Sequence, residues 1–325
     1  MWRVAVIGSG SIVPDFLEAA AEVEELEIYA IFGRERSLEK LQRFQRDWNI
    51  EKIYHDYEVL LKDEQVDVVY IALPNHLHYA YAKLALEHGK HVIVEKPFAS
   101  TYAEAKELAE LAGERHVAVF EAISNQYLPN YLKTRELLPE LGDVKIVQMN
   151  FSQYSRRYDQ FKQGVVLPVF DPKQSGGALM DLNVYNIHYI TGLFGKPDTV
   201  QYHANIERGI DTSGVLTMTY PGFQCVAIGA KDCRAPLSIN VQGDRGYIHS
   251  DCAPNGYQTF VFGTNAGQEN RYALNDGKPR LYFELQAFAD MLKQGDPAVL
   301  KTCSRHTLEV MEILDVARQQ AGIVF

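Results

Sequence analysis

The chain has 325 residues, of which 46% are hydrophobic and 23% are charged, and its formal net charge is −10. At roughly 100–200 residues per domain, this length predicts about two domains, each able to bury a core without disulfides or a structural metal. The composition excludes collagen-like, disordered and disulfide-scaffold proteins. An acidic chain without basic runs argues against nucleic acid and membrane as partners and leaves a small-molecule substrate.

Two further features concern location and charge distribution. No apolar run approaches the roughly 18–20 residues of a membrane-spanning helix. The four cysteines show no CxxC or zinc spacing, so free thiols and a cytoplasmic location are predicted. Residues 1–121 carry 13 Lys/Arg against 22 Asp/Glu, a net charge of −9. This raises the question of whether so acidic a half binds an anion.

The first 121 residues alternate short β-branched runs with longer amphipathic stretches. Strands are predicted at Arg3–Ile7, Glu27–Phe32, Val66–Leu73, His91–Val94 and Val117–Phe120. Helices are predicted between them at Pro14–Val23, Leu38–Trp48, Ala80–Glu87 and Tyr102–Ala112. This order indicates βαβ units, and therefore a doubly wound parallel sheet of the Rossmann kind over residues 1–121.

After Glu121 the pattern predicts an α+β domain over residues 122–325. Strands with turn signals between them are expected at Val144–Tyr154, Thr199–Asn205, Val215–Tyr220, Phe223–Ala230, Leu237–Gln242, Gly246–His249 and Tyr257–Phe262. Helices are expected at Gly176–Gly195, Glu284–Lys293 and Ser304–Gln320. The expected sheet is mostly antiparallel with about six strands, one of its faces is left open, and that face predicts a homodimer or higher homo-oligomer.

A glycine-rich turn follows the first strand directly. Gly8 suits a tight turn, and Gly10 lets a pyrophosphate approach the backbone at the start of the next helix. The predicted phosphate-binding residues are therefore Gly8, Ser9, Gly10, Ser11 and Ile12. The third position of the GxGxxG fingerprint is Val13, which departs from the usual small residue.

The end of the second strand reports on the choice of dinucleotide. Arg34 stands where an acidic residue would bind the ribose of NAD, and with Ser37 it suits the 2′-phosphate of NADP. NADP(H) is therefore the preferred cofactor. Glu35 keeps NAD(H) possible as the cofactor. The alternative interpretation of this segment is a run of solvent-exposed charges that binds no cofactor.

Polar residues also follow the fourth and fifth strands. Ligands bind at the carboxyl ends of the strands in such a sheet, so the nicotinamide is expected near Leu73, Pro74, Asn75, His78, Glu95 and Lys96. Lys96 can donate to a substrate oxygen that is hydroxyl in one redox state and carbonyl in the other. His76 and His78 lack a third ligand, so no metal site is predicted.

In the second domain, Asp181, Tyr185 and His188 recur at helical spacing after Gly176-Gly177. Their side chains would share one face of a helix that is otherwise apolar, and burying that stripe without partners would be costly. One interpretation is a substrate cleft in which Tyr185 transfers a proton and Asp181 orients either Tyr185 or the substrate. The alternative is a core Tyr and His whose polar atoms bond to nearby backbone.

Together these motifs resemble the glucose-fructose oxidoreductase/inositol dehydrogenase/MocA family, in particular its dihydrodiol dehydrogenase-like branch. The resemblance rests on Gly8-Ser9-Gly10, Pro74-Asn75, Glu95-Lys96-Pro97 and Gly176-Gly177-Ala178 with Asp181 and Tyr185. It implies a Rossmann domain, a second domain with a large open sheet, NAD or NADP, and sugar, cyclitol or dihydrodiol substrates. It also implies that Lys96, Tyr185 and Asp181 are the catalytic residues.

We therefore predict an NADP(H)-preferring oxidoreductase that acts on CH–OH groups and binds substrate through Lys96, Asp181, Tyr185 and His188. An unperturbed tyrosine pKa of about 10 is high for a base, so a nearby Lys96 ammonium that lowers it belongs to the hypothesis. The alternatives are an NADP-binding sensor without turnover and a reductase of imines or double bonds like biliverdin reductase. Asn183, which replaces the family's usual glycine, is expected to fill or reshape the substrate pocket.

Overall fold

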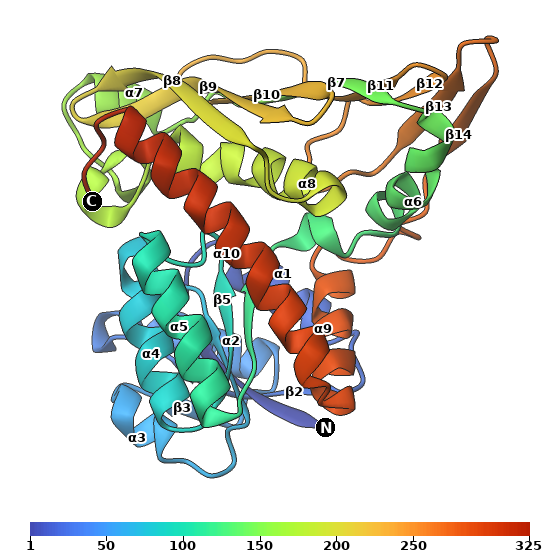
Figure 1. Ribbon diagram of the computed structural model, residues 1–325. Coiled ribbons are helices and arrows are strands. Elements are labelled where there is room, and N and C mark those ends of the chain that lie inside the picture. The colour runs from blue at the N-terminus through green and yellow to red at the C-terminus, as the bar shows by residue number, and fades with distance from the viewer. The chain divides into compact units, whose positions relative to one another are not determined.

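The computed structural model describes residues 1–325, which divide by their contacts into two compact units (Figure 1). The first unit comprises Met1–Ala122 and Lys278–Leu308, and the second comprises Ile123–Gly277 and Glu309–Phe325. The sequence had assigned all of 122–325 to the second domain. The segment 278–308 groups with the first unit because helix α9 (Tyr282–Gln294) is buried there, with Phe288 stacked 4.6 Å from Phe120.

The first unit is built on a six-stranded parallel sheet in the order β3-β2-β1-β4-β5-β6. This confirms the predicted doubly wound Rossmann sheet. The strands are β1 (Trp2–Ile7), β2 (Leu26–Phe32), β3 (Lys52–Tyr54), β4 (Val68–Ile71), β5 (His91–Glu95) and β6 (Val119–Ala122). The sequence pattern missed β3, whose three residues are too few to show a periodicity.

Helices connect these strands, as a parallel sheet requires. They are α1 (Val13–Ala20), α2 (Leu38–Asp47), α3 (Tyr57–Leu61), α4 (His78–Glu87) and α5 (Tyr102–Arg115). Helix α5 begins with a capping box in which Thr101 and Glu104 each accept a backbone N–H of the other. Such a pair satisfies two orphan donors and fixes where the helix starts.

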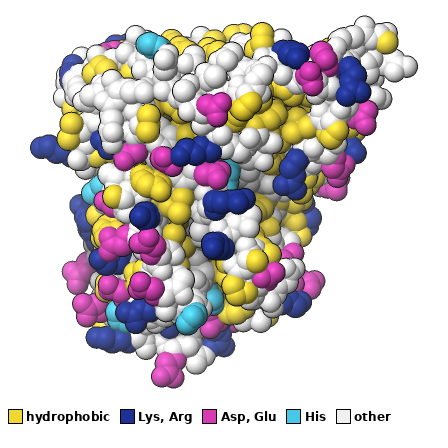
Figure 2. Space-filling model, viewed as in Figure 1, with side chains coloured by type: hydrophobic (Ala, Val, Ile, Leu, Met, Phe, Trp, Pro, Cys, Tyr) yellow, Lys and Arg dark blue, Asp and Glu magenta, His cyan; other side chains and the backbone are white.

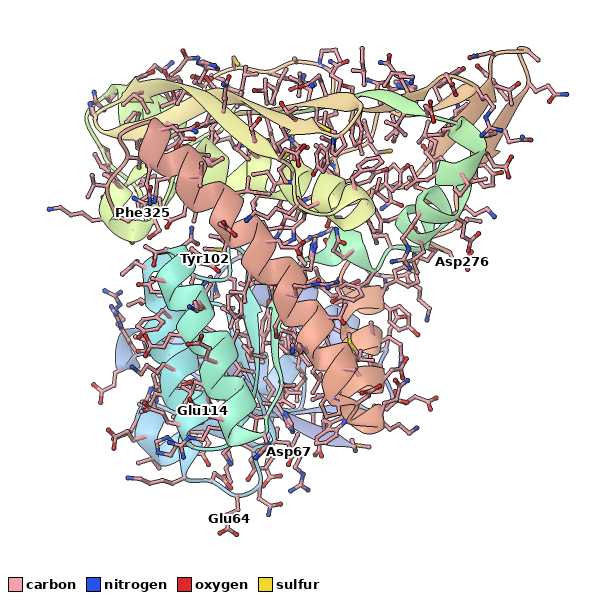
Figure 3. The ribbon with its side chains drawn as sticks, viewed as in Figure 1. Glu64, Asp67, Tyr102, Glu114, Asp276 and Phe325 are labelled. Carbon is pink, nitrogen blue, oxygen red and sulfur yellow. The ribbon has the colours of Figure 1, made fainter.

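Acidic residues of the first unit lie at both edges of its sheet, with Asp15 and Glu35 following the carboxyl ends of β1 and β2. Asp67 directly precedes β4, and Glu114 lies in the last turn of α5, so both mark the amino-terminal edge of the sheet. Figure 3 shows them with Glu64 at that edge and Tyr102 at the other end of α5. Figure 2 shows acidic and basic side chains interspersed on the visible surface, so the net charge forms no single field there.

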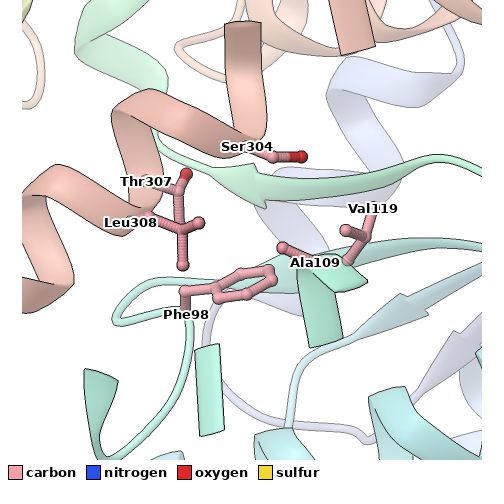
Figure 4. Close-up of a pocket in the computed structure, with 6 residues that line it drawn as sticks. All are labelled: Phe98, Ala109, Val119, Ser304, Thr307 and Leu308. Carbon is pink, nitrogen blue, oxygen red and sulfur yellow. The ribbon is translucent and has the colours of Figure 1, made fainter. Parts of the chain in front are cut away.

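The first half of α10 (Pro297–Gln320) packs on the first unit. Figure 4 shows Ser304, Thr307 and Leu308 over Phe98, Ala109 and Val119. The gap among these six side chains has no room for a water molecule. It is therefore a packing contact and not a ligand site.

The second unit is built on an eight-stranded sheet in the order β14-β13-β12-β11-β7-β10-β9-β8. Its strands are β7 (Val144–Ser152), β8 (Thr199–Glu207), β9 (Ile210–Tyr220), β10 (Phe223–Ala230), β11 (Ser238–Gly243), β12 (Gly246–Ser250), β13 (Phe260–Thr264) and β14 (Glu269–Tyr272). All neighbours are antiparallel except β7 and β10, which are parallel. This confirms a large, mostly antiparallel sheet. The sequence missed β14, whose residues are mostly exposed and polar.

One face of this sheet is covered by helix α8 (Val184–Phe194), as Figure 1 shows. Asn186 on α8 donates to the carbonyl of Ile228 on β10 at 3.0 Å. Alternate residues of β7, β9 and β10 are buried on the α8 side. The remaining helices of the unit are α6 (Pro129–Leu137), α7 (Tyr158–Lys162) and the second half of α10.

Candidate functional site

The glycine loop after β1 contains two glycines with different roles. Gly8 has a φ of +118°, and a Cβ there would lie 2.5 Å from the backbone oxygen of Ala72, so the fold itself requires glycine. A Cβ on Gly10 would meet only that same oxygen, at an ordinary 3.7 Å. Gly10 is exposed and nothing in the protein demands it. The space at Gly10 therefore fits the close approach of a ligand that the fingerprint implies.

Helix α1 presents its amino terminus to this loop. The N-cap residue Ile12 makes no side-chain capping bond, so the first-turn N–H groups are left for another acceptor. Such N–H groups and the helix dipole favour a phosphate. Val13, the departure from the fingerprint, is fully buried in the core. The residues present therefore fit a dinucleotide pyrophosphate.

Two cations flank the loop beyond β2. Arg34 is exposed in an extended conformation, and Ser37 is partly exposed in the turn that follows. Lys40 in α2 donates a hydrogen bond to the carbonyl of Ser9 in the loop. The sequence reasoning missed Lys40, although a second cation in the helix that directly follows Arg34 was a usable signal. Arg34 and Lys40 give this end of the sheet the positive charge that the bulk composition lacks.

His78 lies behind the loop after β4 rather than in the open. Its side chain is fully buried, with Nδ1 2.8 Å from the carbonyl oxygen of Pro97 and Nε2 2.8 Å from that of Leu73. Burial lowers the pKa of its imidazole. The sequence placed His78 among the cofactor ligands. That assignment stays a prediction, and in the structure the His78 ring lies between the carbonyls of Leu73 and Pro97.

The two charged residues at the end of β5 point to different surroundings. Glu95 is buried, and its Oε1 accepts a hydrogen bond of 2.6 Å from the Tyr70 hydroxyl. Burial raises the pKa of Glu95, and it raises the pKa of the neighbouring Glu284 carboxyl on α9 still further. Lys96 is partly exposed, and its bond to Pro97 is cis. Of this predicted pair, Lys96 is therefore the side chain with access to a ligand.

In the second unit, the predicted stripe runs from the surface into the interior. Asp181 keeps 34% of its side chain exposed, Tyr185 is 7% exposed and His188 is fully buried. The segment before α8 is a π-helix, Leu179–Asn183, whereas the sequence predicted one continuous α-helix. Single π-turns inside α-helices occur frequently at functional sites. Exposure thus falls along the stripe, and Asp181 is the only one of its three side chains with substantial exposed surface.

Side chains from distant strands hold this segment. Lys231, just after β10, donates to Oδ2 of Asp181 at 2.5 Å. Asp211 on β9 accepts from the backbone N–H of Leu179 at 2.6 Å. A Cβ on Gly177, whose φ is +106°, would lie 2.0 Å from Asp211 Oδ1, and a Cβ on Gly176 would lie 2.7 Å from the carbonyl oxygen of Pro168, so both positions require glycine. The sequence reasoning missed Lys231 and Asp211, because no local pattern links them to Asp181.

Asn183, at the end of the π-helix, packs against the sheet. Its side chain is fully buried, and its amide donates to the carbonyl of Ala227 on β10 at 3.1 Å. Its Cβ packs 2.8 Å from the position a Cβ on Gly229 would take. The expectation that Asn183 fills or reshapes the substrate pocket stays a prediction. In the structure, the Asn183 amide is held by a backbone carbonyl of the sheet.

Other kinds of site are not evident. No group of three His, Cys, Asp or Glu side chains is arranged to hold a metal ion. No helix combines the length and the apolar character needed to cross a membrane. The four cysteines are free.

Family comparisons match both parts of the chain. Residues 2–123 match the model of the GFO/IDH/MocA oxidoreductase family with an NAD-binding Rossmann fold, and residues 131–249 match the GFO/IDH/MocA C-terminal domain. The chain is 33% identical over 326 residues to scyllo-inositol 2-dehydrogenase (NADP(+)) of Bacillus subtilis, covering 100% of this chain and 98% of that protein. It is 27% identical over 342 residues to trans-1,2-dihydrobenzene-1,2-diol dehydrogenase of Mus musculus, covering 99% and 98%.

Solved structures share the fold at lower identity. The 3-ketoreductase KijD10 of Actinomadura kijaniata, in complex with NADP and TDP-benzene, matches with a TM-score of 0.86 at 23% identity, covering 98% of this chain and 97% of that one. Levoglucosan dehydrogenase in complex with NADH and levoglucosan matches with a TM-score of 0.86 at 17% identity, covering 99% and 97%. These two matches support the fold and the order of its parts.

Proposed function

Because the chain belongs to the GFO/IDH/MocA oxidoreductase family, we propose that it is an NADP(H)-preferring dehydrogenase or reductase of CH–OH groups. Its substrate class is a sugar, a cyclitol or a dihydrodiol, by analogy with the inositol and dihydrodiol dehydrogenases that it is similar to. One observation carries the proposal. At the carboxyl end of β5, Lys96 is partly exposed, whereas Glu95 and His78 are buried.

The first unit supplies the residues that would hold the dinucleotide. The N–H groups at the start of α1, after Ser9, Gly10, Ser11 and Ile12, suit the pyrophosphate. Arg34 and Lys40 suit the 2′-phosphate of NADP, since guanidinium and ammonium groups form charge-assisted hydrogen bonds with phosphate oxygens. This charge supports NADP over NAD, as does the NADP(+) dependence in the name of the Bacillus subtilis relative.

The proposed chemistry divides the work between three side chains. When bound, the nicotinamide supplies the hydride for reduction and accepts it in oxidation. In the oxidation direction, the phenolate of Tyr185 takes the substrate hydroxyl proton while the Lys96 ammonium donates a hydrogen bond to the same oxygen. These groups stabilise the negative charge that develops on oxygen in the transition state. Asp181 accepts a hydrogen bond from a substrate hydroxyl and orients it, and reduction runs through the same contacts in reverse.

The experiment compares Lys96→Ala and Tyr185→Phe with the wild-type protein. With an active substrate from a panel of sugars, cyclitols and diols, each variant is expected to lose about 100-fold or more in kcat, because each removes a group that contributes to proton transfer. Nicotinamide absorbance measures turnover, and fluorescence titration measures NADP affinity, which stays unchanged for Tyr185→Phe.

Lys106→Ala is the matched control, since Lys106 is an exposed lysine of α5 paired only with Glu110. It keeps wild-type turnover. Wild-type turnover in both Lys96→Ala and Tyr185→Phe would contradict the catalytic assignment. NADP binding without turnover on any substrate would favour the sensor alternative, and turnover only on imines or conjugated double bonds would favour the biliverdin reductase-like alternative.

We also propose that the open face of the eight-stranded sheet joins two copies of the chain. Ile146 and Val215 are 47% and 37% exposed on the face opposite α8. Val226 and Ile228 of β10 lie on the same face. Exposed apolar side chains among polar ones, such as Gln148 and Gln224 on this face, suit an isologous dimer contact. Light scattering is expected to give a dimer that Val215→Glu weakens, and a wild-type monomer at micromolar concentration would contradict the proposal.

A cytoplasmic location is the remaining part of the proposal. Cys225, Cys233, Cys252 and Cys303 form no disulfide bond with one another. Free thiols are typical of a reducing compartment. Fractionation of the native source, with thiol labelling of the recovered protein, tests this location.

A further inference from the structure

A lysine with almost no exposed surface stands at the end of β10. The side chain of Lys231 is 3% exposed. Its backbone is held on both sides, since its N–H donates to Thr212 at 2.8 Å and its carbonyl accepts from Ser155 at 2.9 Å. Burying an ammonium is costly unless the charge is paired and hydrogen-bonded. The proposed reaction gives Lys231 no role, so its position calls for an explanation.

The partners of Lys231 identify what it holds. Its Nζ donates to Asp181 Oδ2 at 2.5 Å and to the carbonyl of Val169 at 3.3 Å, and it lies 5.1 Å from the centre of the Phe170 ring. The carbonyl and the ring lie within one short segment that packs around the ammonium. Asp181, by contrast, is 34% exposed. Lys231 therefore binds the carboxylate from its buried side, and part of the Asp181 side chain is exposed to solvent.

A second carboxylate anchors the same segment by different atoms. Asp211 Oδ2 accepts from the Leu179 N–H at 2.6 Å and from the Tyr202 hydroxyl at 2.7 Å. Burial raises the pKa of Asp211 to about 6, and the nearby charge of Lys231 opposes that rise. Asp211 thus holds the backbone at the start of the π-helix. On the π-helix itself, Lys231 contacts the Asp181 side chain and not the backbone.

We propose that Lys231 is a positioning residue, which fixes the Asp181 carboxylate in its ionised form and in one orientation, one turn before Tyr185. Asp181 then accepts a hydrogen bond from a substrate hydroxyl and does not donate a proton, because an adjacent ammonium favours the charged carboxylate. This inference rests on the proposed function, in which Asp181 orients the substrate.

The first arm of the test needs no substrate. Lys231→Met, Asp181→Asn and the double variant are made in the full chain, and urea unfolding is followed for each. Because the two side chains touch, the effects of the single changes are expected to be non-additive, with less loss in the double variant than their sum. Full additivity would overturn the inference whatever the enzyme's substrate is. Lys231→Gln, which keeps a donor without the charge, replaces Lys231→Met if that variant does not fold.

The second arm measures turnover and distinguishes a positioning role of Lys231 from a general disturbance of the fold. Lys231→Met is expected to lower kcat/KM about 10- to 100-fold, as a misplaced orienting group does. The NADP dissociation constant stays unchanged. The acid limb of the pH profile moves to higher pH, since the carboxylate loses the cation that favours its ionised form. In the Asp181→Asn background, Lys231→Met adds no further loss in kcat/KM.

Lys173→Met serves as the matched control, because Lys173 is an exposed lysine of the same unit, and it leaves every parameter unchanged. A loss in the Asp181→Asn background equal to that in the wild type would overturn the inference. Absence of wild-type turnover on every substrate would count against the proposed function instead, and the unfolding arm would still decide the role of Lys231.

Discussion

The phosphate loop and the segment around Asp181, on which the proposed chemistry depends, are held by different kinds of contact. In the loop, Gly8 donates to Phe32 and packs against Ala72, so its supports are backbone atoms at the ends of the two neighbouring strands. The Asp181 segment is held by side chains, Asp211 lying 32 residues beyond Leu179 and Lys231 lying 50 beyond Asp181. Backbone atoms are present whatever side chain a residue carries, so the loop shows its signature in its own glycines. The Asp181 segment depends on the particular side chains of two distant residues.

The largest loss of stability is expected for a substitution at Gly8, where a new Cβ would meet backbone atoms. Gly8→Ala combines a strained φ with a contact of 2.5 Å to the Ala72 carbonyl, so it lowers the free energy of unfolding by about 3 kcal/mol or more. Gly10→Ala changes stability by no more than about 0.5 kcal/mol, yet it weakens NADP binding. Urea unfolding and fluorescence titration measure both. Equal loss of stability in the two variants would contradict the assignment of Gly8 to the fold and of Gly10 to cofactor binding.

At Gly177, the atom that a new Cβ would meet belongs to a side chain and not to the backbone. Gly177→Ala brings a Cβ against Asp211, which can shift, so the expected loss of stability is about 2–3 kcal/mol and smaller than at Gly8. Gly209→Ala is the control, because Gly209 has a φ of +80° and no atom within 4 Å of the new Cβ. The difference between the two variants isolates the contact with Asp211. Identical losses would show that this contact does not matter.

The buried Asp211 makes the second unit sensitive to pH. Its pKa is about 6 in the folded chain against roughly 3.9 when unfolded, so the stabilising proton is fully present below pH 4 and is lost as the pH rises through 6. The stability of wild type relative to Asp211→Asn is expected to fall on the order of 2–3 kcal/mol between pH 4 and 7. Unfolding curves across this range measure it. A difference that does not vary with pH would contradict the assignment.

The smallest effect concerns the choice of cofactor. Arg34→Ala is expected to raise the NADP dissociation constant about tenfold, through loss of a charge-assisted hydrogen bond, and to leave NAD nearly unchanged. Lys40→Met is expected to act in the same direction. Arg36→Ala, an exposed arginine two residues further on, is the control. An equal rise in the dissociation constants of NADP and NAD would indicate that Arg34 stacks on the adenine and does not bind the 2′-phosphate.

The acidic first half of the chain proves compatible with an anionic cofactor. Charges act over a Debye length of about 8–10 Å, and Glu64, Asp67 and Glu114 lie at the opposite edge of the sheet from the phosphate loop. The groups proposed to hold the phosphates are the amino terminus of α1, Arg34 and Lys40, with Asp15 and Glu35 beside them. The net charge of this half therefore does not by itself decide cofactor binding.

Strand periodicity and contiguous motifs, which are visible along the chain, were enough to predict the Rossmann sheet and to single out the glycine loop, Arg34 and the Glu95-Lys96-Pro97 segment as candidate site residues. The sequence also indicated the stripe of Asp181, Tyr185 and His188 from helical spacing. Tertiary structure alone decided that His78 and Glu95 turn inward, that Asn183 bonds to β10, and that Lys231 and Asp211 hold the Asp181 segment. Whether a polar side chain faces a ligand or a protein partner depends on atoms that arrive from distant strands, and a local pattern holds no record of them.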